Sequence, residues 1–352
     1  MKIQLLFSKY KTSLILSVIF LIPACIIQYR STYPSIFLEI PIFVISLYIL
    51  LRSASLFTGF ATKLGSKIGL SKLATGILII SIGTSAPELF SSFAAVLENQ
   101  PNMVIGNIFG TVIANTLLGI GCAAIFSKIP LGVHKDVFGT QMAIFFAAVV
   151  LSAACLYDGV LFYYEGAVLL VVLVCYLGYV VQAAPENSDK KIENKDDNPQ
   201  KTEKENTLLI IILLLLNLFF LFLSGDFVVS SLIYGSKYMG VSNVKVASSL
   251  LAIGTSVPEI ATAIALVRQN NPDSLFGEII GSNIFDILGV LGAISLISPL
   301  TMSGNLLLFL SISMFAVFML MHVIMNDRKI NRLEGVVLVL LFCVFTMQLT
   351  AL

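Results

Sequence analysis

Apolar segments of about 20 residues recur along most of the chain, which is the length that a helix needs to span a bilayer. Short polar loops separate them, and this pattern predicts an all-α polytopic membrane protein. We place ten core helices near residues 35–61, 73–97, 103–126, 138–156, 162–182, 207–234, 244–267, 274–297, 304–325 and 333–351. An earlier apolar run, Leu14 to Ile27, predicts one additional N-terminal transmembrane helix.

The N-terminal run also permits a second interpretation. Three lysines precede it, as in a signal peptide, and Ile22-Pro23-Ala24-Cys25 is faintly similar to a lipoprotein cleavage box. Proline is atypical in such a box, and a protein with many spans rarely needs a cleaved leader. We therefore expect the helix to be retained.

Composition supports the membrane assignment. Of 352 residues, 57% are hydrophobic and 12% are charged, with a mean hydropathy of +0.97, which excludes a soluble globular domain. The net charge is +1 and the charges lie in short loops, so no basic surface for nucleic acid is expected. The lipid bilayer is the expected surrounding.

The basic residues predict an orientation, because cytoplasmic loops of membrane proteins carry an excess of Lys and Arg. With the N-terminus inside, 17 of the 21 basic residues face the cytoplasm. Only Arg30, Lys237 and Lys245 face out, and Arg52 lies within a span. We expect a multi-pass protein of a plasma or bacterial inner membrane, with a cytoplasmic N-terminus and an external C-terminus.

One long polar stretch, Pro185 to Asn206, is rich in Lys, Asp, Glu and Asn and has no apolar periodicity. It predicts a disordered cytoplasmic linker, since its acids lack the spacing of a calcium-binding loop. The expected organisation is an N-terminal tail and helix (1–32), a first five-helix repeat (33–182), the linker (183–206) and a second five-helix repeat (207–352).

The two halves are copies of each other in a constant register. An offset of 171 residues carries Glu88 to Glu259, Pro101 to Pro272 and Asn115 to Asp286, without a gap over more than fifty residues. Five helices separate equivalent positions, and an odd number places the second copy upside down in the membrane. Two inverted-topology five-helix repeats are a transporter architecture.

The repeat contains acids within the spans. Gly83-Thr84-Ser85-Ala86-Pro87-Glu88 recurs as Gly254-Thr255-Ser256-Val257-Pro258-Glu259. A carboxylate in a span is costly to bury and indicates function. Each proline also removes a backbone donor, which predicts an interrupted helix beside each acid. Such backbone is tolerated at membrane depth where it lines a cavity.

Oxygen-bearing side chains surround both acids at helical spacing. Thr84 and Ser85 share a helix face with Glu88, as Thr255 and Ser256 do with Glu259. The following helix adds Thr111 and Asn115 in the first copy and Ser282 and Asp286 in the second. These ligands suit hard cations such as Ca²⁺ or Na⁺. Close helix packing is an alternative role for the Gly, Ser and Thr residues, but it does not explain buried acids.

At these motifs the sequence resembles the calcium/cation antiporter superfamily, and most closely its sodium/calcium exchanger branch. The resemblance rests on GTSAPE (83–88), AIGTSVPE (252–259), GNIFGTVIANTLLGIG (106–121) and GEIIGSNIFDILGVLG (277–292), and it extends from about Tyr33 to the end of the chain. It implies exchange of Ca²⁺ for Na⁺ by alternating access, with no enzymatic activity and no cofactor.

The resemblance also implies site residues. Glu88 and Glu259 would be the central acids on Ca²⁺, and backbone carbonyls of Ser81 and Ala252 would contribute. The remaining Ca²⁺ and Na⁺ ligands would be Thr84, Ser85, Thr111, Asn115, Thr255, Ser256, Ser282 and Asp286. The first copy departs from the second where Thr111-Val112 replaces Ser282-Asn283, which predicts an altered Na⁺ subsite or ion choice.

Other functions stay open at this point. A buried carboxylate can carry a proton, so exchange of Ca²⁺ or another cation for H⁺ is the main alternative, and a K⁺ requirement is a further one. Asn115 opposite Asp286 favours Na⁺. An intramembrane hydrolase is disfavoured because His134 and His322 both lie near span ends, away from Ser85 and Ser256. A passive channel is disfavoured by the inverted repeats.

Overall fold

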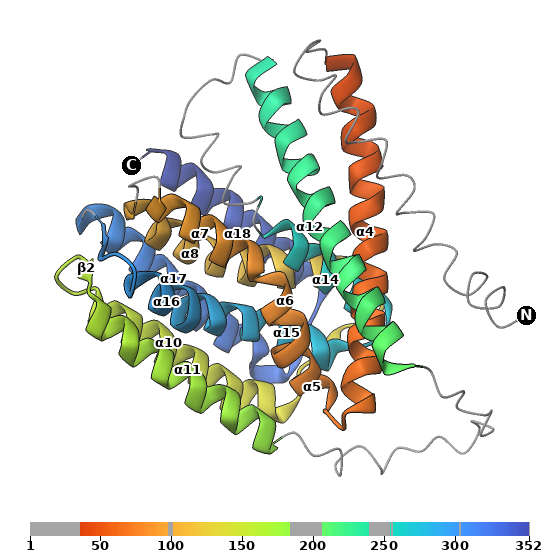
Figure 1. Cartoon of the computed structure of the whole chain (residues 1–352), viewed down its shortest axis with the longest axis horizontal. Coiled ribbons are helices and arrows are strands. Elements are labelled where there is room, and N and C mark those ends of the chain that lie inside the picture. The colour runs from red at the N-terminus through yellow and green to blue at the C-terminus, as the bar shows by residue number, and fades with distance from the viewer. Residues whose placement is uncertain are drawn as a thin grey trace, which may run out of the picture.

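The computed structural model describes residues 36–97, 101–183, 206–238, 254, 256–302 and 304–351, which are mostly helical (Figure 1). Within these ranges, nine helices are long and apolar enough to cross a membrane, and they match nine of the ten predicted core spans. The other, predicted at 244–267, is described mainly over its second half. The predicted N-terminal helix and residues 184–205 of the predicted linker lie outside the described residues.

In the first copy, the second and third core spans are each built from several helical segments. In order, the first copy contains α4 (Ile36–Lys67), α5 (Lys72–Thr75), η1 (Gly76–Ser81), α6 (Ile82–Thr84), α7 (Ala86–Leu97), α8 (Asn102–Ala114), η2 (Asn115–Gly119), α9 (Ile120–Phe126), β1 (Leu131–Gly132), η3 (Val137–Gln141), α10 (Met142–Cys155), β2 (Val160–Leu161) and α11 (Tyr163–Ala183).

The second copy repeats this order. It contains α12 (Thr207–Tyr238), α14 (Val257–Arg268), α15 (Pro272–Ile284), η5 (Phe285–Val290), α16 (Leu291–Ser295), β3 (Leu300–Thr301), α17 (Gly304–Ile324), η6 (Met325–Asp327), β4 (Lys329–Ile330) and α18 (Arg332–Ala351). Here η1, η2, η3 and η5 are π-helical, and η6 is a 3₁₀ turn.

Two short antiparallel strand pairs, which the hydrophobic pattern did not predict, demonstrate the inversion. β1 pairs with β4 and β2 pairs with β3. In the repeat, β1 is equivalent to β3 and β2 to β4, so each pair joins non-equivalent loops. β1 and β2 flank α10 and therefore lie at its opposite ends. Equivalent loops of the two copies thus lie on opposite sides of the bundle, as the odd helix count predicted.

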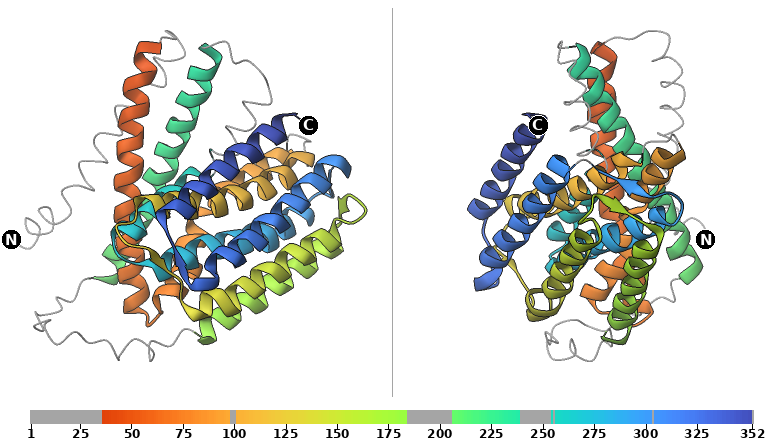
Figure 2. Two further views of the ribbon diagram at one scale, coloured as in Figure 1. Left: turned by 180° about the vertical axis from the view of Figure 1, so that it is seen from behind. Right: turned by 90° about the vertical axis from the view of Figure 1, so that its left-hand side faces the viewer.

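The helices exchange partners in the same symmetrical manner. α11 of the first copy packs against α16 of the second, and α18 of the second packs against α9 of the first. The equivalent helices α4 and α12 pack side by side and are steeply inclined to α10 and α11 (Figure 1 and Figure 2). The copies are therefore interlocked into one bundle.

The centre of the bundle is formed by the α8–η2–α9 and α15–η5–α16 spans. In the most apolar 18-residue stretch of each of these spans, 83% and 94% of the residues are buried, compared with 28% for α11 and 17% for α18. The outer helices expose large apolar side chains such as Val171, Val174 and Leu340, as expected for a lipid-facing surface. Polar residues on the central spans are therefore enclosed by protein.

Candidate cation site

Both acid-bearing spans are interrupted at the same place. In the first copy α6 ends at Thr84 and α7 begins at Ala86, with Ser85 between them at φ −80° and ψ 5°. In the second copy Ser256, which precedes α14, has φ −81° and ψ −3°. The prediction of an interrupted helix beside Glu88 is confirmed, and the backbone of the second copy follows the same path into Glu259.

π-helical segments carry the partner residues of the next span. Asn115 begins η2 and Asp286 lies in η5, at equivalent positions of the two copies. π-segments inside α-helices are frequent at functional sites, because the extra residue redirects a side chain and leaves backbone groups less regularly bonded. The spacing of apolar residues gave no sign of these segments.

Hydrogen bonds bring the two copies together at this level. The hydroxyl oxygens of Thr84 and Ser282 lie 3.4 Å apart, and the Ser282 hydroxyl donates to the Ser81 carbonyl at 3.5 Å. Thr84 also donates to the Ser81 carbonyl at 3.2 Å. Three residues from spans 200 residues apart in the sequence thus converge, and all three offer oxygen.

The acids and their amide partner are fully buried. Glu88, Glu259, Asp286 and Asn115 each have 0% exposure. The carboxylate oxygens of Glu259 and Asp286 and the Asn115 amide have no hydrogen-bond partner in another described residue. Glu259 lies close enough to Glu88 and Asp286 to be repelled by their charge. Because burying one uncompensated ion costs several kcal/mol, this arrangement favours a bound cation or proton.

The remaining hydroxyls border the acids. Ser85 lies beside Asp286, although the geometry is outside hydrogen-bond limits. Ser256 and Thr111 are buried at 0% exposure, and α14 packs against η2 as α7 packs against η5. Two expected contributors, Thr255 and Ala252, lie outside the described residues.

Carboxylates alone do not form a compact metal site here. In the ranges that the structure describes, no group of three or more His, Cys, Asp or Glu side chains is placed to hold a metal ion. Hydroxyl, amide and carbonyl oxygens must therefore complete any coordination shell, and Ca²⁺ and Na⁺ accept such mixed oxygen shells. Neither histidine lies on an acid-bearing span: His134 is exposed in a loop, and His322 stacks on Phe138 near the end of α17.

One buried acid was missed by the sequence reasoning. Glu278 on α15 has 0% exposure, and its Oε1 lies 3.0 Å from the Thr262 hydroxyl oxygen, within hydrogen-bond distance. Glu259 is also within range of its charge. The signal was present, because Glu278 is an acid within a predicted span, but its counterpart in the first copy is the neutral Asn107.

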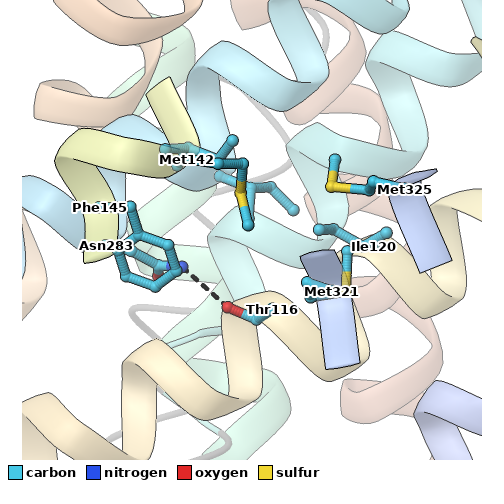
Figure 3. Close-up of a pocket in the computed structure, with 9 residues that line it drawn as sticks. Thr116, Ile120, Met142, Phe145, Asn283, Met321 and Met325 are labelled. Carbon is cyan, nitrogen blue, oxygen red and sulfur yellow. Dashed lines mark hydrogen bonds between the residues drawn. The ribbon is translucent and has the colours of Figure 1, made fainter. Parts of the chain in front are cut away.

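Asn283, where the first copy has Val112, makes a second link between the copies. Its amide nitrogen donates to the Thr116 hydroxyl at 2.9 Å, beside a small pocket lined by Met142, Met321 and Met325 (Figure 3). Thr116 in turn donates to the Val112 carbonyl at 2.8 Å. The amide that the first copy lacks therefore joins α15 to η2, in packing between the copies.

Comparison with known proteins agrees with this fold. The profile of the family described as "Sodium/calcium exchanger protein" matches residues 38–182 and 209–351. The chain is 33% identical to the inner membrane protein YrbG of Escherichia coli (strain K12), over 73% of this chain and 79% of that one. It is 26% identical to the sodium/calcium exchanger MaX1 of Methanosarcina acetivorans, over 88% and 97%. A solved structure of the sodium-calcium exchanger NCX_Mj, soaked with Na⁺ and Sr²⁺, superposes with a TM-score of 0.72 at 25% identity, covering 88% of this chain and 98% of that one.

Proposed function

Because the chain belongs to the sodium/calcium exchanger family and is a cation antiporter, we propose that it exchanges Ca²⁺ for Na⁺ across the membrane by alternating access. The observation that carries the proposal is the convergence of buried oxygen ligands from both inverted copies, with Thr84 and Ser282 in contact and Glu88 and Glu259 within electrostatic range. NCX_Mj and MaX1, which are named as sodium/calcium exchangers, support the choice of ions.

In this proposal Glu88 and Glu259 are the central ligands of Ca²⁺, and the carbonyls of Ser81 and Ala252 contribute. The Ca²⁺ and Na⁺ sites are completed by Thr84, Ser85, Thr111, Asn115, Thr255, Ser256, Ser282 and Asp286. All of them supply the oxygen ligands that hard cations prefer. The neutral Asn115 opposite Asp286 reduces the charge that monovalent ions must balance, which favours Na⁺ as the counter-ion.

Competition for the same oxygens couples the two fluxes. Without a cation, the buried carboxylates would repel one another in a medium of low dielectric constant. The protein can therefore reorient at low cost only when either Ca²⁺ or a set of Na⁺ ions neutralises them. This requirement prevents a passive leak and distinguishes an antiporter from a channel.

The charge at the two ends of the bundle supports an orientation. The β1–β4 end carries Lys128, Lys135, Arg328, Lys329 and Arg332, whereas residues 156–165 and 296–302 at the β2–β3 end contain no Lys or Arg. By the positive-inside rule, the β1–β4 end faces the cytoplasm. We place the protein in a plasma or bacterial inner membrane with an external C-terminus.

The test is Ca²⁺ uptake into liposomes that contain purified protein. An outward Na⁺ gradient should drive uptake, and Glu88→Gln and Glu259→Gln should each reduce it to the level of empty liposomes. Asp136→Asn is the matched control: this acid is 68% exposed at the N-terminal end of η3, so the variant should transport normally.

The same liposomes separate the alternatives. Uptake that ignores Na⁺ and follows a pH gradient would reject Na⁺ coupling in favour of Ca²⁺/H⁺ exchange. A dependence on K⁺ in addition to Na⁺ would identify K⁺ as a co-transported ion. Ca²⁺ conduction without any counter-ion gradient would indicate a channel and reject antiport.

A further inference from the structure

Glu278 lies on the stripe of α15 that leads to the proposed cation site. It precedes Ser282 by four residues and Asp286 by eight, so the three side chains share one face, with Glu278 about 12 Å from Asp286 along the helix axis. It is fully buried and is not one of the proposed cation ligands. A fourth acid at this depth requires its own explanation.

The hydrogen bonds of Thr262 indicate the protonation state of Glu278. The Thr262 hydroxyl lies 2.9 Å from the Glu259 carbonyl and 3.0 Å from Oε1 of Glu278. A hydroxyl has one proton, and an ionised carboxylate only accepts. If Glu278 were ionised, both acceptors would compete for that proton. If Glu278 is neutral, it donates to Thr262 and Thr262 donates to the carbonyl, so both bonds are satisfied.

Among the described residues, the charged groups around Glu278 do not offer a counter-ion. On α15 and the elements that pack against it, the titratable groups are Lys72, Cys155, Glu259, Arg268, Asp273 and Asp286. Lys72 is exposed, and the Arg268 guanidinium lies over the Phe126 ring. Glu259 is the group that interacts electrostatically with Glu278, and it has the same charge. Oε2 of Glu278 has no hydrogen-bond partner among the described residues.

The equivalent residues of the first copy show which features of the Thr262–Glu278 pair occur in both copies. These residues are Ser91 and Asn107, and Ser91 donates to the Glu88 carbonyl at 3.2 Å. The hydroxyl-to-carbonyl bond is therefore kept in both copies, while the acid is replaced by a neutral amide. Ser91 is exposed and Asn107 half-buried, whereas Thr262 and Glu278 are sealed from solvent.

We propose that Glu278 is a proton-binding site of this antiporter, held as a neutral carboxyl against Thr262 and separate from the carboxylates that bind Ca²⁺. Loss of its proton to water would place a negative charge near Glu259 and strengthen the attraction of the site for cations. Ca²⁺ uptake should therefore rise with pH partly through Glu278.

Infrared spectroscopy of the full-length protein tests the site directly. Saturating Ca²⁺ ionises the central acids, so the C=O stretch of a protonated carboxyl that remains should belong to Glu278. The band should disappear in Glu278→Gln, which keeps a neutral donor to Thr262, and should shift in Thr262→Val, which keeps the acid but removes its acceptor. A band unchanged in both variants, or absent from the wild type, overturns the proposal.

A transport measurement gives a second test. The ratio of initial Ca²⁺ uptake rates at high and low pH should fall toward one in Glu278→Gln, and it should keep its wild-type value in Asp136→Asn. A wild-type pH ratio in Glu278→Gln overturns the proposal. The transport test rests on the whole proposed function, and the infrared test rests only on the binding of Ca²⁺ by the central acids. Absence of Na⁺-driven uptake in the wild type would reject the proposed function, while an infrared band that persists in Glu278→Gln would reject the role of Glu278.

Discussion

The equivalent glycines Gly106 and Gly277 provide a sharp test of the packing between the copies. Gly277 on α15 lies where this helix crosses η1. A Cβ atom added there would lie 2.4 Å from the Leu73 carbonyl oxygen and 3.3 Å from the Gly76 Cα. At Gly106, a Cβ would meet only the terminal methyl of Met302 among the described residues, at 3.4 Å. Gly277→Ala should therefore destabilise the protein, and Gly106→Ala should not.

The magnitude follows from these contacts. Nonbonded heavy atoms attract at about 3.5 Å, so Gly277→Ala would force η1 and α15 apart by about 1 Å. Overpacking of this kind costs about 1–3 kcal/mol. Gly106→Ala meets a flexible side chain and gains up to about 1 kcal/mol of helix propensity. We expect the two variants to differ by about 2 kcal/mol, roughly 30-fold in the ratio of folded to unfolded protein.

Thermal unfolding in detergent, followed by circular dichroism, measures this difference. For a chain of 352 residues, a change of about 2 kcal/mol should separate the two apparent Tm values by roughly 3 °C, with Gly277→Ala the lower. Gly277→Ala should also slow Ca²⁺ uptake, because η1 carries Ser81 and α15 carries Ser282. Equal Tm values, or a lower value for Gly106→Ala, would refute the close crossing of η1 and α15.

Two further predictions concern the contacts of α11. Tyr176→Phe removes the hydroxyl that donates to the buried Gln141 side-chain oxygen at 2.9 Å. The loss should cost about 1–3 kcal/mol and lower the apparent Tm. Tyr179→Phe, at an exposed position, is the control and should leave the apparent Tm unchanged. Gly166→Ala should destabilise the folded protein by about 1–3 kcal/mol, since the added Cβ would lie 2.8 Å from a carbonyl oxygen of α16. Gly178→Ala is its control, because no described atom lies within 4 Å of a Cβ added there. Equal Tm values within either pair of variants would contradict these contacts.

Much of the architecture could be predicted because the bilayer imposes simple rules. Span length, the need to satisfy every backbone group, and the asymmetry of basic loops together predict the helices and their direction. The nine spans found within the described residues follow the predicted positions. The register between Glu88 and Glu259 predicts inversion from counting alone, and the β1–β4 and β2–β3 pairs confirm it.

The sequence also indicated the chemistry, since acids, hydroxyls and amides in apolar spans are costly and therefore informative. It did not distinguish roles among similar residues. Gly106 and Gly277 are equivalent in the repeat, yet only Gly277 lies at a close helix crossing. The replacement of Asn283 by Val112 in the first copy predicted an altered ion subsite, and the structure shows that the Asn283 amide nitrogen bonds to Thr116.

By itself, then, the sequence determined the spans, their inversion and the presence of acids within the spans, because these depend on local apolar length and on a repeat visible along the chain. Tertiary structure decided which residues meet across the copies. The contact of Thr84 with Ser282, the π-segments at Asn115 and Asp286, and the Thr262–Glu278 hydrogen bond all depend on how distant spans cross. Helix crossing is set by packing over the whole bundle, and no local pattern encodes it.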